Sequence, residues 1–144
     1  MTIEQNIDNC RFNGKIDSVV IENIEKSLGF NIPKNYRHFI ENYGSGNING
    51  FDFFGAYPNV DFENGAVLNI LWRNLGDRKD YGLNPKLLLI GDALCGDYFC
   101  IDIENLNSPI YIWNVSLSNE ETNNLEIIAT DFDDLIEKIF NEKL

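Results

Sequence analysis

Cysteine and histidine are the residues of this chain with the clearest capacity for covalent chemistry. A cysteine attacks as a thiolate, and a nearby histidine is the base that commonly produces it. The one histidine, His38, falls beside the apolar stripe of an expected helix and is therefore predicted to face solvent. Cys95 lies in a glycine-flanked loop, whereas Cys100 is predicted to be a buried small side chain. Nothing in the sequence brings Cys95 and His38 together, so we expect no catalytic residue and no enzymatic activity.

Cysteine and aspartate also recur with a five-residue step, which raises the question of a metal site. The cysteines are Cys95 and Cys100, and the aspartates are Asp92, Asp97 and Asp102. Zinc sites need a second close pair of ligands, and calcium loops need alternating oxygen ligands that end in Glu, so neither pattern fits. We favour aspartates that cap glycine-shaped turns, and we expect no metal. The tract Gly44-Ser45-Gly46 follows a helix and lacks the lysine of a phosphate cradle, so we expect no cofactor.

Negative charge is concentrated in the second half of the sequence. Residues 1–91 carry 11 acidic and 9 basic side chains, whereas residues 92–144 carry 12 acidic side chains and 2 basic ones, Lys138 and Lys143. The net charges of −2 and −10 add to the −12 of the whole chain. Such a surface repels nucleic acid and anionic lipid head groups, so we expect neither as a partner, and it attracts basic proteins. The alternative is that the acidic excess only keeps the domain soluble.

The candidate partner-binding residues are therefore carboxylates, which complement a basic cleft, and aromatic side chains, which anchor interfaces. Further carboxylates are expected on the outer face of the last helix: Asp131, Asp133, Asp134 and Glu137. For each aromatic residue the alternative is a place in the core, under a helix. The candidates are Asp97, Asp102, Glu104, Glu120, Glu121, Tyr57, Trp72, Tyr98 and Trp113.

The helices that must position these residues are indicated by hydrophobic periodicity and by their end signals. Asp17 is expected as the N-cap of the first helix, with Gly29 just after its last turn. Pro33 is expected at the first position of the second helix, which Gly44 ends. The expected helices span residues 17–29, 33–44, 63–79 and 131–140, after an irregular arm over residues 1–15.

The strands are indicated by apolar runs and by strict alternation. Leu87–Ile90 is a continuous apolar run typical of a buried strand, and residues 97–104 alternate between two faces. Shorter strands are expected at 51–54 and 110–113, with loops over 44–50 and 91–96. The sequence therefore predicts one α+β domain over residues 1–144, in which helices flank a mostly antiparallel sheet.

The N-terminal residues lack the basic and apolar regions of a signal peptide, and the apolar runs are too short to span a bilayer. Three widely spaced cysteines do not suggest a disulfide framework. We expect a cytoplasmic protein with reduced thiols.

Four segments, taken in order, match a known pattern. Residues 25–40 read E-x-x-L-G-x-x-I-P-x-x-Y-x-x-F-I and lead into the turn Tyr43-Gly44-Ser45-Gly46. The others are Leu89-Ile90-Gly91-Asp92 with residues 96–102, Pro109-Ile110-Tyr111-Ile112-Trp113, and residues 129–136. Together they resemble the SUKH superfamily over roughly residues 17–141. The departures are Ser45, where the family often has Gly, Asp131, where it often has Ser, and residues 57–84, which have no counterpart in the pattern.

The resemblance implies a binding role in place of a chemical one. Bacterial members of this superfamily are largely immunity proteins, which bind and neutralise a cognate toxin that is often a nuclease. A fungal branch is similar to a regulator of cell-wall synthesis that acts as an interaction hub. We therefore expect an immunity protein that occludes a basic toxin surface, or else a regulatory or scaffold module of the same fold. The oligomeric state stays open.

Overall fold

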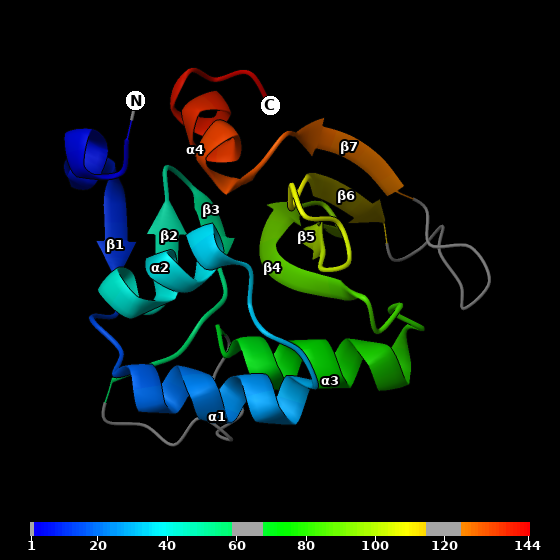
Figure 1. The fold of residues 1–144 in the computed structure, drawn as a ribbon. Coiled ribbons are helices and arrows are strands. Elements are labelled where there is room, and N and C mark those ends of the chain that lie inside the picture. The colour runs from blue at the N-terminus through cyan, green and yellow to red at the C-terminus, as the bar shows by residue number, and fades with distance from the viewer. Residues whose placement is uncertain (1, 59–67, 115–124) are drawn as a thin grey trace.

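The computed structural model describes residues 2–58, 68–114 and 125–144, and within them the strands form one antiparallel sheet (Figure 1). The seven strands follow their chain order across this sheet, β1-β2-β3-β4-β5-β6-β7. The strands are β1 (Cys10–Phe12), β2 (Gly46–Ile48), β3 (Phe51–Phe53), β4 (Leu87–Leu94), β5 (Asp97–Asp102), β6 (Ile110–Asn114) and β7 (Leu125–Ala129). The helices are α1 (Ser18–Leu28), α2 (Lys34–Tyr43), α3 (Ile70–Asp80) and α4 (Phe132–Phe140), with a 3-10 helix η1 (Glu4–Asn9). The predicted α+β fold is confirmed.

Aromatic side chains join the helices to the sheet. The Phe39 ring of α2 lies 5.5 Å from the Phe132 ring of α4, and Phe53 of β3 lies 5.7 Å from Phe132. The buried Tyr36 hydroxyl donates toward the Ile90 carbonyl of β4 at 2.9 Å. In Figure 1, α1 and α3 lie side by side below the strands, and α4 lies beside β7 at the upper end. This packing places α2, α4 and η1 around one end of the domain.

A buried amide ties α3 to β4. Asn74 is 0% exposed, and its side-chain nitrogen donates to the carbonyls of Ile70 (2.8 Å) and Leu89 (2.9 Å). Its side-chain oxygen accepts from the Leu89 N–H at 2.7 Å. β3 pairs with β4 only at Phe53 and Gly91, so β3 does not reach the backbone of Leu89. The Asn74 side chain pairs with the Leu89 N–H and C=O in its place.

The helix ends follow the sequence signals closely. Asp17 is the N-cap of α1, and Gly29 follows its last turn in the left-handed conformation, with φ at 93°. Pro33 was predicted as the first helical residue of α2. The helix begins at Lys34 instead, so Pro33 is its N-cap. Asp131 caps α4 by accepting from the Asp134 N–H at 2.8 Å.

Other boundaries differ from the predictions. The arm over residues 1–15 is not irregular throughout, since it contains η1 and β1, and the loop predicted over 44–50 contains β2. These two short strands pair with each other, with Arg11 opposite Asn47, so each one is stabilised by a partner distant in sequence. Gly46 allows this close approach, because a Cβ there would lie 2.1 Å from the Arg11 carbonyl oxygen.

The later boundaries also shift. β4 continues through most of the loop predicted over 91–96, β5 ends at Asp102 instead of residue 104, and β7 was not predicted. The predicted helix over 63–79 begins at Ile70 in the structure, and residues 63–67 lie outside the described part. No helix in the described part combines the length and apolarity that crossing a membrane requires.

Candidate protein-binding surface

Helix α4 has two polar flanks of different character. With 3.6 residues per turn, residues four apart lie on the same flank, so Asp133 and Glu137 share one side and Asp134 and Lys138 share the other. The Lys138 ammonium lies 3.3 Å from the Asp134 carboxylate and donates to the Ile128 carbonyl of β7 at 2.7 Å. The flank with Asp133 and Glu137 faces α2 and η1 instead, because both residues line a hollow between these elements.

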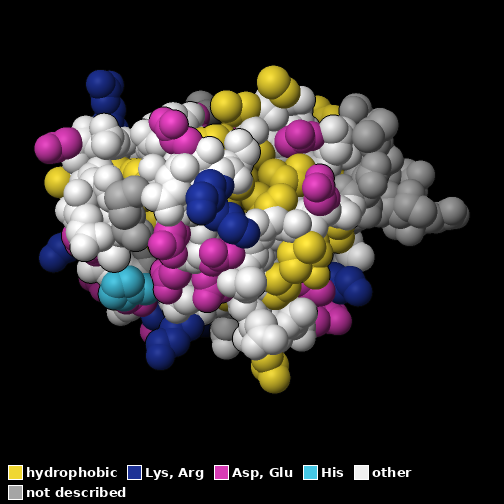
Figure 2. Space-filling model, turned by 90° about the horizontal axis from the view of Figure 1, so that it is seen from above, with side chains coloured by type: hydrophobic (Ala, Val, Ile, Leu, Met, Phe, Trp, Pro, Cys, Tyr) yellow, Lys and Arg dark blue, Asp and Glu magenta, His cyan; other side chains and the backbone are white. Residues whose placement is uncertain are grey.

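We call this hollow the acidic cleft. It has a volume of about 490 Å³, and its floor is apolar. The carboxylates of Glu4, Asp133 and Glu137 and the His38 imidazole lie around its mouth, and Figure 2 shows acidic side chains gathered beside the histidine on this face. The lining residues are Thr2, Ile3, Glu4, Asn35, His38, Phe39, Tyr43, Phe132, Asp133, Ile136 and Glu137.

Hydrogen bonds hold two of these carboxylates in place. The Tyr43 hydroxyl donates to the Glu4 carboxylate at 2.6 Å, and the Asn35 amide donates to Asp133 at 3.3 Å. The bond from Tyr43 lowers the pKa of Glu4, whereas burial and this same bond raise the pKa of Tyr43 to about 12. Partial burial, with the neighbouring carboxylate of Asp131, raises the pKa of Asp133. The site therefore carries negative charge whose mutual repulsion an added cation would relieve.

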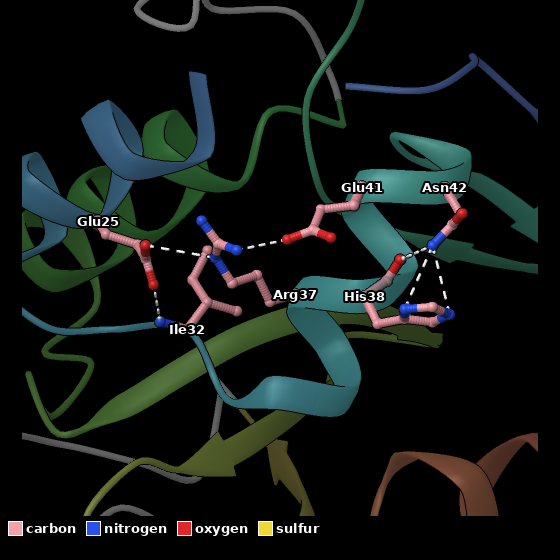
Figure 3. Close-up of polar contacts among 6 residues, drawn as sticks. All are labelled: Glu25, Ile32, Arg37, His38, Glu41 and Asn42. Carbon is pink, nitrogen blue, oxygen red and sulfur yellow. Dashed lines mark hydrogen bonds and ion pairs between the residues drawn. The ribbon is translucent and has the colours of Figure 1, made fainter. Parts of the chain in front are cut away.

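Arg37, a basic side chain of α2, has carboxylate partners of its own. Arg37 on α2 forms an ion pair with Glu41 and lies 3.5 Å from Glu25 of α1 (Figure 3). Glu25 also accepts from the Ile32 N–H at 2.6 Å, which ties α1 to the segment that leads into α2. Because Arg37 lies beside the same carboxylate, it supports this connection between α1 and α2. Among the described residues that line the acidic cleft, none is Lys or Arg, and His38 is the one side chain there that can become cationic.

A comparison with known families identifies the chain. The family model SUKH_6, described as SMI1-KNR4 cell-wall, matches residues 20–136, which extend from α1 into α4. The chain belongs to this family. Glu4 and Glu137 lie outside the matched residues, so the family match does not describe these two carboxylates of the acidic cleft.

The acidic candidates on β5 do not form one cluster. Asp97 begins the strand and accepts from the Asn114 amide at 2.6 Å, whereas Asp102 ends the strand and caps the turn to Glu104 through a 3.0 Å bond to its N–H. At about 3.3 Å per residue, the two aspartates lie roughly 16 Å apart along the strand. Glu120 and Glu121 lie outside the described residues.

The aromatic candidates differ in their accessibility. Trp72 on α3 is 53% exposed and is available to a partner. Tyr57 is half-buried, and its hydroxyl accepts from the Leu68 N–H at 3.0 Å. Tyr98 is half-buried under the guanidinium of Arg73, which lies 5.3 Å from the ring centre.

Trp113 requires a correction. It is 0% exposed, and its ring packs 6.2 Å from that of Tyr98, its cross-strand neighbour. A side chain without exposed surface makes no first contact with a partner, so Trp113 belongs to the core of this structure. Alternation along β6 does not reveal this, because the two buried residues of the strand, Ile110 and Trp113, lie three positions apart and do not follow a period of two.

Sequence reasoning placed Asp133 and Glu137 on an acidic helix face, but it missed the cleft. The missing members are Glu4, Asn35 and His38, which come from η1 and α2. Glu4 was overlooked because residues 1–15 carry no periodic pattern. The spacing of Asp133 and Glu137, four residues apart on one helix, was the available signal.

None of the three cysteines lines this cleft. Cys95 is exposed in the β4–β5 turn with φ at 55°, and Cys100 is buried, which raises the pKa of its thiol. The His38 ring lies 3.3 Å from the Asn42 amide nitrogen, on the same helix (Figure 3). Within residues 2–58, 68–114 and 125–144, no three His, Cys, Asp or Glu side chains are grouped as metal ligands.

Proposed function

We propose that this protein binds another protein through the acidic cleft and has no catalytic role of its own. The observation that carries the proposal is a hollow with carboxylates at its mouth and an apolar floor that includes Phe39 and Phe132. A lysine or arginine side chain suits such a site, because its methylene stem packs on the floor while its charged head reaches the carboxylates.

The biological role that we propose is immunity. Members of the SUKH superfamily are commonly immunity proteins, and the partner would be a cognate bacterial toxin, with a nuclease as the favoured class. A nuclease presents basic side chains to phosphates, and an acidic protein surface that engages those side chains excludes the nucleic acid. The net charge of −12 also supports fast, salt-sensitive association with such a partner. Action in the cytoplasm, before the toxin reaches its target, belongs to the same proposal.

The test is co-expression with the product of the adjacent open reading frame, followed by measurement of the dissociation constant of the complex at two salt concentrations. We expect binding to weaken as salt rises. The double substitution Asp133→Asn and Glu137→Gln should weaken it about tenfold or more, since close interfacial charge pairs contribute about 1.5–7 kcal/mol.

The matched control is Asp97→Asn with Glu104→Gln, which removes the same number of charges at the start of β5 and in the turn that follows it. Equal effects of the two double variants would leave only a general charge effect and would refute a role for the cleft. A toxin with a neutral or acidic contact surface would refute the electrostatic argument altogether.

The alternative function is a regulatory or scaffold module that binds an endogenous protein. The family description as cell-wall related favours this second candidate. A growth assay separates the two, because only an immunity protein rescues cells that express the toxin. Rescue that disappears with the Asp133 and Glu137 substitutions would support immunity.

A further inference from the structure

A second hollow lies on the other flank of α4, and we call it the apolar groove. Its volume is about 520 Å³, and its floor comes from strands β3 to β7. The Phe51 and Phe99 rings, 5.7 Å apart, lie within it. Leu94 and Leu144 on its rim are 50% and 52% exposed, so apolar surface is open to solvent here. The lining residues are Phe51, Ala93, Leu94, Phe99, Ile112, Ile128, Lys138, Lys143 and Leu144.

The charged side chains that line this groove are basic, whereas most charged side chains in this half of the sequence are acidic. Residues 92–144 contain 12 acidic side chains and 2 lysines, and both lysines line this groove. Lys138 is fixed by Asp134 and the Ile128 carbonyl, whereas Lys143 makes no ion pair with any described residue. Figure 2 shows hydrophobic side chains gathered beside a basic side chain on this face.

We propose that the apolar groove binds a small molecule with an apolar chain and a carboxylate, of the fatty-acid type. Ligand pockets usually measure about 300–1,000 Å³, have apolar walls and contain a few placed polar groups, and this groove has all three properties. The chain lies along the floor, over Ile112 and Ile128, and the carboxylate lies at the end with Lys143. Glu126, which stands opposite Ile112 on β7, disfavours the reverse orientation. This inference does not depend on the function proposed for the acidic cleft.

The test is titration of the full chain with decanoate, followed by amide NMR shifts and by calorimetry. We expect saturable binding below the concentration at which decanoate self-associates, with shifts centred on residues of the groove. Lys143→Gln should weaken binding roughly tenfold, since it removes one charge-assisted contact. Leu94→Ser, a change at an exposed rim position, should weaken it as well. Lys86→Gln is the matched control, because Lys86 is an exposed lysine outside the groove, and it should leave binding unchanged.

Decyltrimethylammonium and octyl glucoside, which have apolar chains with a cationic and a neutral head, complete the test. Equal binding of either probe would overturn the role of the lysines and would leave a general apolar contact surface. Binding of decanoate that Lys143→Gln and Lys86→Gln weaken equally would also overturn the proposal, as would the absence of saturable binding. Sedimentation equilibrium would detect a second copy on the groove, and a dimer that decanoate does not dissociate would contradict the proposal.

Discussion

Replacement of Asn74 by leucine tests how the sheet is held at its centre. The Asn74 amide satisfies both the N–H and the C=O of Leu89, and all of these groups are buried. Leucine has a similar volume but neither donor nor acceptor. Asn74→Leu therefore leaves two buried backbone groups of β4 without partners. The Ile70 carbonyl also loses a side-chain donor, but within α3 it can still accept from the backbone N–H four residues later.

The magnitude follows from these two groups. A buried polar group without a partner costs about 1–3 kcal/mol, so two cost about 2–6 kcal/mol. Burial of the leucine side chain offsets about 1.5–3 kcal/mol of this. With the middle of each range, a cost of about 4 kcal/mol and an offset of about 2 kcal/mol, we expect the free energy of unfolding to fall by about 2 kcal/mol, a substantial share of the roughly 5–15 kcal/mol typical of a domain.

The assay is urea denaturation followed by circular dichroism, with the slope against urea used to confirm that the same surface unfolds. The matched control is Asn31→Leu, the same substitution at an exposed position before α2, for which we expect a change within about 0.5 kcal/mol. A midpoint for Asn74→Leu equal to that of Asn31→Leu would refute the reasoning, because Leu89 would then have another partner.

The remaining predictions concern the α4 cap, one tyrosine and the cysteines. Asp131→Ala removes the side chain that caps α4 at 2.8 Å and should lower the free energy of unfolding by about 1 kcal/mol in the same urea assay. Tyr43 has a pKa raised from 10.0 to about 12, so the unfolded chain loses this proton first and stability should fall as the pH rises from 10 to 12. Ultraviolet titration should detect this late ionisation, and Glu4→Gln should lower the pKa only in part, since burial is the larger cause. A thiol reagent at neutral pH should label exposed Cys95 quickly and buried Cys100 only after unfolding. Mass spectrometry of the labelled peptides measures the order, and faster labelling of Cys100 would contradict its burial.

Much of the fold was predictable because its signals are local. Asp17 and Gly29 mark the ends of α1 within one turn, and the run from Leu87 to Ile90 indicates a strand buried on both faces. These patterns depend on residues a few positions apart, where backbone geometry dictates the contacts. The family resemblance was also present in the sequence, as the match over residues 20–136 confirms.

The short elements were not predictable in the same way. β1 and β2 have three residues each; β1 pairs with β2 alone, and β2 lies between β1 and β3. β7 carries no strict alternation and forms by pairing with β6. A three-residue strand has little intrinsic preference, so its formation depends on a partner that the linear sequence does not identify.

The sequence alone determined the acidic balance, the helix faces and the family, because composition and periodicity are properties of the chain itself. Only the tertiary structure decided which charges meet. It brought Glu4 to Asp133 from opposite ends of the chain and placed both lysines of the acidic half on one apolar groove. The physical reason is that electrostatic and apolar contacts depend on distance in space, and packing of the core sets that distance independently of separation along the chain.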